Sequence, residues 1–281
     1  MEETKKIGRR KYDFYKSLDL ENISEDALEK LETFCKGTTV SQAIKEMQEF
    51  EQGIYKPAKI IETEKPEPKE PLKLTKESLW KLFTAAYRKS EGVSYSKEYQ
   101  SLENIKPLIY YFIGDEENFK KCKAVSLKSE PSLKKGLLII GGYGNGKTSA
   151  LKALEASLID SNIKFKGFTA NEVVNAYEAL NNEIEKTEFW DLMCTGTRYF
   201  DDVLTEREAN NYGKVDLFKD ILEKRYANNK RTYISINYKD GTNQDLDAGL
   251  QQLAERYGSR VYDRLFAMFN IIEFKGKSFR K

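Results

Sequence analysis

Residues 141–148 read GGYGNGKT, and no other stretch limits the possible folds of this chain so strongly. Gly141, Gly146, Lys147 and Thr148 satisfy the phosphate-binding pattern G-x-x-x-x-G-K-[ST]. The apolar run GLLII comes directly before the loop, and a helical pattern comes directly after it. Glycine permits the backbone angles with which successive N–H groups converge on phosphate oxygens, and a helix N-terminus favours anions. The sequence therefore predicts a nucleotide-binding loop between a buried strand and a helix.

This loop supplies most of the predicted ligands for ATP and Mg²⁺. Lys147 is expected to reach the β and γ phosphates, and the hydroxyl of Thr148 is expected to bind Mg²⁺. The remaining nucleotide contacts are predicted to come from the rest of the loop and the first helical turn, namely Gly141, Gly142, Tyr143, Gly144, Asn145, Gly146 and Ser149.

Two acids and an amide are predicted to complete this site. The segment TRYFDD places Asp201 and Asp202 at the end of a predicted strand. Asp201 is expected to complete the Mg²⁺ shell, and Asp202 to polarise the attacking water. Many P-loop ATPases have glutamate at the second position, which is longer by one methylene, so slow hydrolysis is expected. A further strand, RTYISIN, ends at Asn237, whose side chain could contact the γ-phosphate or the water.

The order of the predicted elements indicates the fold class. The strand segments GLLII, NIKFKGFTA, TRYFDD and RTYISIN alternate with the helical segments NEVVNAYEALNN and FKDILEKRYANN. This alternation indicates an α/β fold with a parallel sheet flanked by helices. Two further helices are expected before the loop, ESLWKLFTAAYRK and a second one that is interrupted or begins near Pro107. Near the C-terminus, ERYGSRVYDRLF predicts one helix with Arg256, Arg260 and Arg264 spaced four apart, before the strand-like run NIIEF.

The N-terminal part of the chain has a different character. Four of the six prolines lie between Pro57 and Pro71. We therefore expect a small helical region over residues 1–56, a Pro/Glu/Lys-rich linker over 57–73, and an ATPase domain with leading helices over 74–281.

Two short amphipathic helices are predicted within that first region, at 24–36 and 40–52. Their apolar stripes are expected to form a core, and a partner-binding face is the alternative. The segment RRKYDFYK at 9–16 is expected to be a solvated tail, although its basic and aromatic residues would also suit a single-strand binder.

Composition excludes several kinds of chemistry. The chain has no histidine and only three cysteines, far apart in the sequence, so histidine catalysis and cysteine–histidine metal clusters are excluded. The formal net charge of +2 argues against a protein that coats nucleic acid by charge alone. No apolar stretch suggests a signal peptide or a membrane partner, and a cytoplasmic location is expected.

Taken together, the motifs GGYGNGKT, YFDDVLTE, RTYISIN, GSRVYDRL and the terminal SFR resemble the DnaC/DnaI-type helicase loaders and the related IstB transposition ATPases, which are AAA+ proteins. The resemblance spans roughly residues 100–281 and implies an AAA+ sheet with a reduced or absent helical lid. It gives Asn237 the sensor 1 position and Arg280 the sensor 2 position, where an arginine contacts the nucleotide of its own subunit. It also implies that Arg260 and Arg264 act on the nucleotide of a neighbouring subunit.

The resemblance further implies an ATPase that assembles as a homo-oligomer and loads a replicative ring helicase on single-stranded DNA. On domain order alone, the N-terminal helices would hold the helicase. A transposition helper that acts on duplex DNA with a transposase is one alternative. A nucleotide-gated scaffold with little hydrolysis is another, and Asp202 in place of glutamate motivates it.

Overall fold

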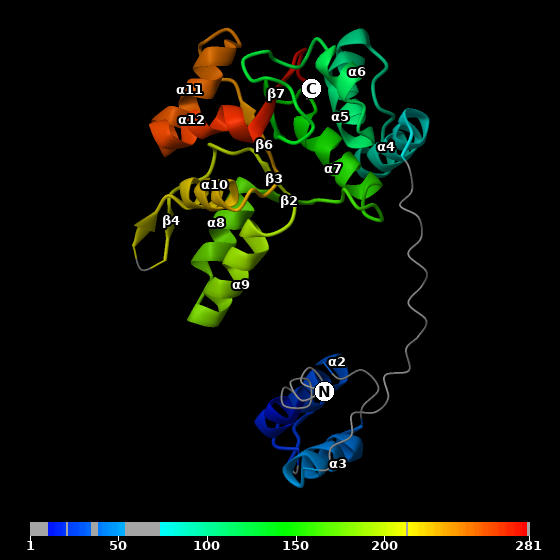
Figure 1. The fold of residues 1–281 in the computed structure, drawn as a ribbon, viewed down its shortest axis with the longest axis vertical. Coiled ribbons are helices and arrows are strands. Elements are labelled where there is room, and N and C mark those ends of the chain that lie inside the picture. Colours follow the sequence, from blue (N-terminus) through cyan, green and yellow to red (C-terminus); the bar gives the residue numbers. More distant parts are fainter. Residues whose placement is uncertain (1–10, 21, 35–38, 54–73, 212, 280–281) are drawn as a thin grey trace. The chain divides into compact units, whose positions relative to one another are not determined.

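A computed structural model describes residues 11–20, 22–34, 39–53, 74–211 and 213–279. The chain divides into two compact units between Glu70 and Pro71 (Figure 1). The linker predicted over 57–73 lies outside the described residues. Each unit is described by itself.

The N-terminal unit contains helices around a small core. Residues 11–17 are helical, and they are followed by α2 (Glu25–Phe34) and α3 (Val40–Glu51), which confirm the two predicted helices. The hydroxyl of Ser24 accepts the N–H of Ala27 at 3.3 Å ahead of α2, and Thr39 and Gln42 form a capping box ahead of α3. The buried side chains are contributed by all three helical segments and the turn between the first two, namely Tyr15, Leu18, Leu20, Leu31 and Ala43.

The expected solvated tail at 9–16 is wrong for the residues that are described. Tyr15 is only 1% exposed, and its hydroxyl donates to Glu46 at 2.9 Å. The ring of Tyr12 stacks on Phe50 with the ring centroids 4.8 Å apart. Residues three or four apart lie on the same face of a helix. Because this segment is helical, Tyr12 and Tyr15 share the face that packs on α3.

The larger unit is built on a five-stranded parallel sheet in the order β2-β3-β6-β1-β7. The strands are β1 (Gly136–Gly141), β2 (Lys166–Thr169), β3 (Arg198–Asp201), β6 (Thr232–Asn237) and β7 (Phe269–Phe274). Gly141 at the end of β1 lies beside Asn237 of β6 and Phe274 of β7. Parallel strands place their carboxyl ends at one edge, so the ends of β1, β3 and β6 meet there.

Helices cover both faces of this sheet (Figure 1). Successive side chains of a strand point to opposite faces, so Leu138 and Ile140 enter one core while Leu137 and Ile139 enter the other. The first core is covered by α8 (Ala170–Glu178), α9 (Glu183–Cys194), α10 (Leu217–Ala227), α11 (Leu246–Tyr257) and α12 (Ser259–Met268). The second core is covered by α4 (Lys76–Glu91), α5 (Tyr99–Ile113), α6 (Glu116–Lys120) and α7 (Lys147–Ser157).

The expected α/β fold, a parallel sheet flanked by helices with the glycine loop directly after β1, is thus confirmed. The described residues that follow β7, 275–279, contain no helix. A short antiparallel pair, β4 (Ala209–Asn210) and β5 (Lys214–Val215), lies outside the main sheet.

Two predicted helices differ from the structure. Helix α5 runs through Pro107 without a break, since the buried residues on both sides of the proline pack into the second core and outweigh the missing hydrogen bond. The helix predicted over ERYGSRVYDRLF is divided at Gly258, whose φ of 89° and ψ of 164° end α11 and precede α12. Arg256 therefore belongs to a different helix from Arg260 and Arg264.

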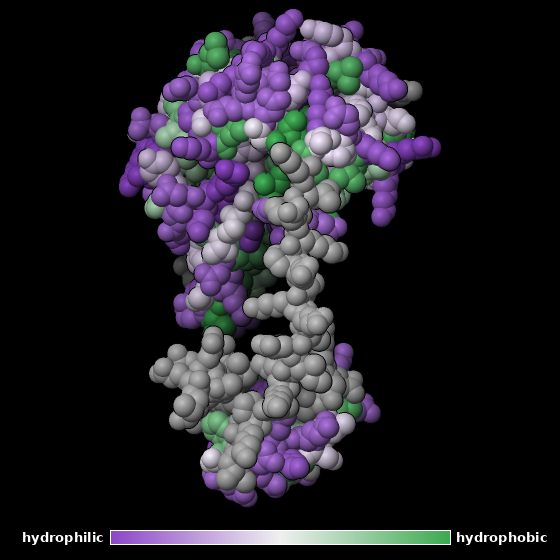
Figure 2. Space-filling model, turned by 45° about the vertical axis from the view of Figure 1, so that its right-hand side comes forward, coloured by the Kyte–Doolittle hydropathy of each residue, from purple (hydrophilic) through white to green (hydrophobic). Residues whose placement is uncertain are grey.

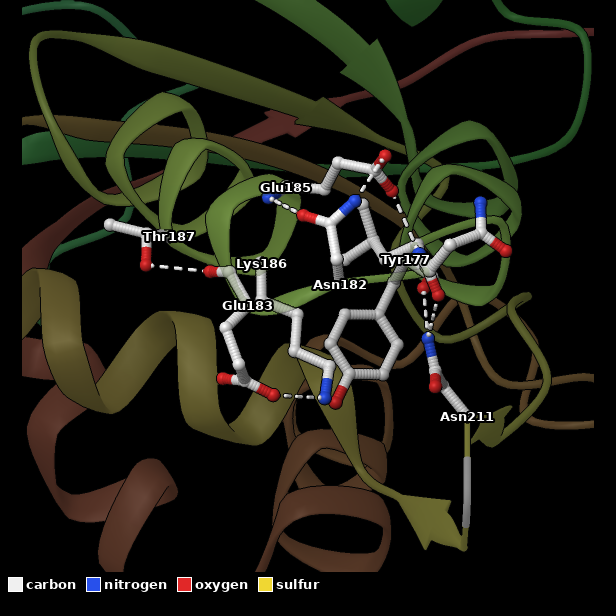
Figure 3. Close-up of polar contacts among 9 residues, drawn as sticks. Tyr177, Asn182, Glu183, Glu185, Lys186, Thr187 and Asn211 are labelled. Carbon is white, nitrogen blue, oxygen red and sulfur yellow. Dashed lines mark hydrogen bonds and ion pairs between the residues drawn. The ribbon is translucent and has the colours of Figure 1, made fainter.

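Helix α9 was not predicted, and side-chain amides fix its connection to α8 (Figure 3). The Oδ1 atom of Asn182 accepts the N–H of Glu185 at 2.9 Å and so caps α9. The side chain of Asn211, just after β4, donates to the carbonyl oxygens of Tyr177 at 2.9 Å and Leu180 at 3.0 Å. The C-terminus of α8, the start of α9 and the loop beyond β4 are therefore held together.

Hydrophilic residues cover most of the larger unit on the face drawn in Figure 2. Among the described residues, no helix combines the length and the apolar character needed to cross a membrane.

Candidate nucleotide-binding site

The loop between β1 and α7 has the backbone of an anion-binding site. Gly144 and Gly146 have φ values of 71° and 91°, which side-chain-bearing residues rarely adopt. Gly146 is the N-cap of α7 and provides no side-chain capping bond, so the first N–H groups of the helix are available to a ligand. A side chain at Gly141 would lie 2.5 Å from the carbonyl oxygen of Phe274, which explains why glycine ends β1.

Lys147 is held at the mouth of this loop. Its side chain is only 5% exposed, and its Nζ atom donates to the carbonyl oxygens of Gly141 at 3.0 Å and Gly142 at 2.9 Å. It also donates to Oδ1 of Asn237 at 2.9 Å. Its ammonium group therefore lies among the loop carbonyls, where phosphate oxygens could replace them as acceptors.

Asp201 is buried at the end of β3 and held by hydroxyl groups. Its Oδ1 atom accepts the hydroxyl of Ser235 at 2.5 Å and also the hydroxyl of Tyr199. Burial, and then the charge of Asp201, raises the pKa of Tyr199 well above its ordinary value, so this phenol remains a donor at neutral pH. The Ser235 hydroxyl also accepts the N–H of Asp202 at 3.0 Å. One side chain of β6 therefore fixes both acids.

Asp202 and Lys147 are joined through Asn237. The Nδ2 atom of Asn237 donates to Oδ1 of Asp202 at 3.3 Å, while its Oδ1 atom accepts from Lys147. The structure thus brings the two acids, the amide and the loop lysine together from β3, β6 and α7. Their catalytic roles stay predictions.

A cavity of about 730 Å³ lies over this loop. That volume falls within the usual range for small-molecule and cofactor sites. The predicted residues that line it are Tyr143, Gly144, Asn145, Gly146, Lys147, Thr148, Ser149, Asp201, Asp202 and Asn237. Gly141 and Gly142 carry the carbonyls that accept from Lys147 and are not in the lining.

Sequence reasoning missed the other walls of the cavity, which are Tyr87, Glu91, Val93, Lys152, Thr169, Thr205 and Phe279. Tyr87, Glu91 and Val93 reach the cavity because the end of α4 and the loop after it pack beside α7. No sequence motif indicates this packing. Phe279 comes from the C-terminal segment, where its N–H donates to the carbonyl oxygen of Gly144 at 2.9 Å. Arg280, the predicted sensor 2 arginine, lies outside the described residues.

The residues present fit Mg²⁺ bound together with a nucleotide. Within the described residues, no group of three or more acids or cysteines could hold a metal ion by itself. Mg²⁺ commonly takes only one or two protein oxygens together with phosphate and water. Thr148 and Asp201 line the same cavity, and they offer this kind of donor set.

The arginines of α12 do not line the cavity of their own chain. Nη1 of Arg260 and Nη1 of Arg264 lie 3.8 and 4.0 Å from the same carboxylate oxygen of Glu223 in α10. The guanidinium of Arg264 also lies 4.7 Å from the centroid of the Tyr226 ring. Arg256, on the preceding helix, instead lies 3.9 Å from Glu208. The structure therefore places Arg260 and Arg264 together, apart from the loop of the same chain.

A P-loop at the end of a central parallel strand, with two acids and an asparagine at the ends of its neighbours, defines the P-loop NTPase class. No protein-family model matches the chain, and a search of curated proteins found no match.

Solved structures with a similar fold include the DnaC helicase loader and DnaI. The chain is 23% identical to the DnaC helicase loader, covering 50% of this chain and 79% of that chain with a TM-score of 0.40. It is 20% identical to DnaI, and the match covers 74% of this chain and 94% of DnaI with a TM-score of 0.44. A putative primosome component from Streptococcus pyogenes serotype M3 is 17% identical, with 66% and 84% covered and a TM-score of 0.43. At these values, conclusions about activity rest on the site itself.

Proposed function

We propose that this chain is an ATP-dependent loader of a ring helicase, with a nucleotide site shared between subunits. The observation that carries the ATPase part is the convergence of Lys147, Thr148, Asp201, Asp202 and Asn237 on one cavity at an uncapped helix N-terminus. Lys147 would bind the β and γ phosphates, and the N–H groups of the loop and α7 would bind the remaining phosphate oxygens. Thr148 and Asp201 would hold Mg²⁺, which supplies charge neutralisation for the transferred phosphoryl group.

Asp202 is proposed as the group that orients the attacking water. Its carboxylate already accepts from Asn237, which in turn accepts from Lys147. Asn237 would therefore keep the acid and the phosphate-binding lysine in a fixed relation. Because an aspartate side chain is one methylene shorter than glutamate, slow turnover is part of the proposal.

Arg260 and Arg264 are proposed to complete the site of a neighbouring subunit. Both lie on α12 and lack a place in their own cavity, and Arg260 has 69% of its side chain exposed. Their attraction to Glu223 would compete with the γ-phosphate of the neighbour, so assembly would depend on bound ATP. Arg280 is proposed as the arginine that contacts nucleotide within its own subunit.

The ATPase proposal is tested with mixed oligomers. Lys147→Ala subunits retain their arginines, and Arg264→Ala subunits retain their nucleotide loop. Each variant alone is expected to turn over ATP poorly, and an equimolar mixture is expected to recover activity, because arginines of one variant serve the loop of the other. Failure of the mixture to exceed both parents would contradict the shared site.

The helicase-loading proposal rests on the motif pattern and on a separate small region ahead of the predicted linker. Domain order alone assigns the predicted N-terminal region, residues 1–56, the role of holding the helicase. The full chain and the cognate replicative helicase would be mixed with and without ATP and analysed by size-exclusion chromatography with light scattering. A complex on single-stranded DNA supports the proposal. Absence of a complex under every nucleotide condition would contradict the helicase-loading proposal. Capture of a transposase on duplex DNA would favour the transposition helper instead.

A nucleotide-gated scaffold is the second candidate, and Asp202 is the observation that favours it. Its φ of 53° and its bond to Asn237 hold a short acid at the position where many P-loop ATPases carry glutamate. The scaffold would bind ATP and assemble with almost no hydrolysis. Equal turnover by the wild type, Lys147→Ala and Asp202→Ala, with intact ATP binding by the wild type, would select the scaffold over the enzyme.

A further inference from the structure

The loop after β3 holds two residues in a rare backbone conformation. Asp202 and Leu204 have φ values of 53° and 82°. Such left-handed geometry at residues other than glycine costs roughly 1 kcal/mol or more each and persists only where the surroundings impose it. The contacts of residues 202–206 therefore identify what keeps Asp202 in place.

The first half of this loop is held by β6. Besides the Ser235 hydroxyl that accepts from Asp202, the backbone carbonyl oxygen of Ser235 accepts the N–H of Val203 at 3.0 Å. Thr205 turns back onto Asp202, whose carbonyl oxygen accepts its N–H at 3.2 Å and its hydroxyl at 2.6 Å. None of these bonds involves Leu204.

The second half of the loop is held by a buried carboxyl group. Oε2 of Glu206 accepts the N–H of Leu204 at 2.8 Å, and Oε1 accepts the hydroxyl of Tyr257 at 2.5 Å. Glu206 and Tyr257 are 7% and 1% exposed. Burial raises the pKa of Glu206, and the Tyr257 hydrogen bond opposes that rise. Both oxygens of a carboxyl group that is costly to bury are thus used to join the loop to α11.

Tyr257 occupies a special place in the chain because it is the last residue of α11. Gly258 follows with a φ of 89°, and α12 with Arg260 and Arg264 begins at Ser259. A single hydrogen-bonded path therefore runs from Leu204 through Glu206 to the junction from which the arginine helix departs.

We infer that Glu206 and Tyr257 are positioning residues for ATP turnover, which hold the Asp202 loop in its active conformation by anchoring it to the α11–α12 junction. This inference rests on the proposed function, since it concerns the same site. Neither residue lines the nucleotide cavity, so their loss should leave nucleotide binding intact and lower the chemical step. The anchor also makes the geometry of Asp202 sensitive to any displacement of α12 on assembly.

The test uses the full chain and the variants Tyr257→Phe and Glu206→Gln. Tyr257→Phe removes only the hydroxyl, and Glu206→Gln places an N–H₂ group where one of the two acceptors was. Affinity for a fluorescent ATP analogue is measured at equilibrium with Mg²⁺, and kcat is measured at saturating ATP. We expect the dissociation constant to change by less than about twofold and kcat to fall about tenfold, the pattern for an interaction needed only in the transition state.

A matched control exists in the N-terminal unit. Tyr15 is also 1% exposed, and its hydroxyl donates at 2.9 Å to Glu46, whose side chain is 24% exposed, so Tyr15→Phe removes the hydroxyl of a buried tyrosine from a partly buried tyrosine–glutamate bond. It should leave kcat unchanged. A fall in kcat for Tyr15→Phe equal to that for Tyr257→Phe would assign the effect to general destabilisation and overturn the inference.

Mixed oligomers distinguish damage to the Asp202 loop from damage to the arginines of α12. Lys147→Ala subunits can lend intact arginines to Tyr257→Phe subunits, but they cannot repair the Asp202 loop of those subunits. We expect no recovery of turnover in this mixture, in contrast to the mixture with Arg264→Ala. Wild-type kcat in Tyr257→Phe, or recovery in its mixture, would overturn the inference. Absence of ATP binding by the wild type would instead overturn the proposed function.

Discussion

Lys147 and Arg225 are two buried cations at different places on the same sheet, and both donate to backbone carbonyl oxygens. Lys147 is 5% exposed at the carboxyl edge, and Arg225 is 0% exposed beside Thr232, the first residue of β6. Arg225 donates to the carbonyl oxygens of Met193 at 2.6 Å, Gly196 at 2.9 Å and Arg231 at 2.6 Å, and to the hydroxyl of Thr232 at 2.8 Å.

The difference lies in what else each cation can reach. Arg225 has four acceptors, and these bonds join α10 to the C-terminal end of α9 and to the starts of β3 and β6. Burial lowers its pKa to about 10, so it remains charged at neutral pH. Lys147 also binds backbone carbonyls, yet it lines a cavity large enough for a nucleotide. Similar burial therefore accompanies a structural role for the arginine and the proposed ligand-binding role for the lysine.

Arg225→Ala should have the largest effect, and that effect should be on stability. It leaves three carbonyl oxygens and a hydroxyl without their buried donor, at roughly 1–3 kcal/mol for each group that stays unsatisfied. We expect the free energy of unfolding to fall by at least about 3 kcal/mol in urea titrations. A loss below about 1 kcal/mol would break the comparison, because Arg225 would then be no more structural than an exposed residue.

Lys147→Ala should have the next largest effect, and it should fall on ligand binding. A charge-assisted hydrogen bond contributes about 1.5–3 kcal/mol, so the affinity for ATP should drop about 10- to 100-fold. The unfolding free energy in the absence of nucleotide should stay within about 1 kcal/mol of wild type, since Lys147 lines a cavity from which water can reach the acceptors that it leaves. Isothermal titration and urea unfolding of the same preparation measure both quantities. A stability loss as large as that of Arg225→Ala would contradict the contrast.

Asn237→Ala tests whether the hydrogen bonds around Lys147 are needed for ATP turnover. The amide joins Lys147 to Asp202, so its removal should lower kcat about tenfold while changing ATP affinity by less than about threefold. Thr232→Val, at the other end of the same strand, is the matched control and should affect stability without affecting kcat. Equal effects of both substitutions on kcat would argue against a role for the amide in turnover.

The smallest expected effect is that of Tyr257→Phe on stability, and it should depend on pH. Burial raises the pKa of Glu206, so the folded state keeps the proton longer than the unfolded state, and its stability falls as pH rises above about 4.3. The Tyr257 hydroxyl stabilises the carboxylate, and the nearby Arg256 charge acts in the same direction. Removing the hydroxyl raises the pKa of Glu206 further. The stability penalty should therefore be larger at pH 8 than at pH 5, by about 1 kcal/mol, in urea titrations at both pH values. A penalty independent of pH would show that Glu206 does not titrate in this range.

Local patterns predicted the parts of the site that follow strands. GLLII, TRYFDD and RTYISIN are apolar runs that end in polar residues or lead into the loop, so the sequence alone places Asp201 and Asn237 at the carboxyl edge of the sheet. The P-loop could be predicted for a similar reason, because its glycines and lysine are contiguous.

Contacts between distant segments could not be predicted in this way. Tyr87 and Phe279 line the same cavity although they are far apart in the sequence. Glu206 and Tyr257, which share a hydrogen bond, are 51 positions apart. The division of the C-terminal helix at Gly258 was also missed, since the spacing of the arginines suits a continuous helix and a glycine inside one is tolerated at modest cost. The turn at Gly258 depends on tertiary packing of α11 and α12, which single-sequence periodicity does not contain.

The carbonyl contacts of Lys147 have a consequence for the entropy of nucleotide capture. A lysine side chain that is free to rotate loses up to about 2 kcal/mol of rotamer freedom when a ligand fixes it. Here Gly141, Gly142 and Asn237 already restrict the side chain, so most of that freedom is lost during folding. In the proposed site, phosphate would replace the present acceptors around an ammonium group that hardly moves, and the ordering cost of binding would be correspondingly small.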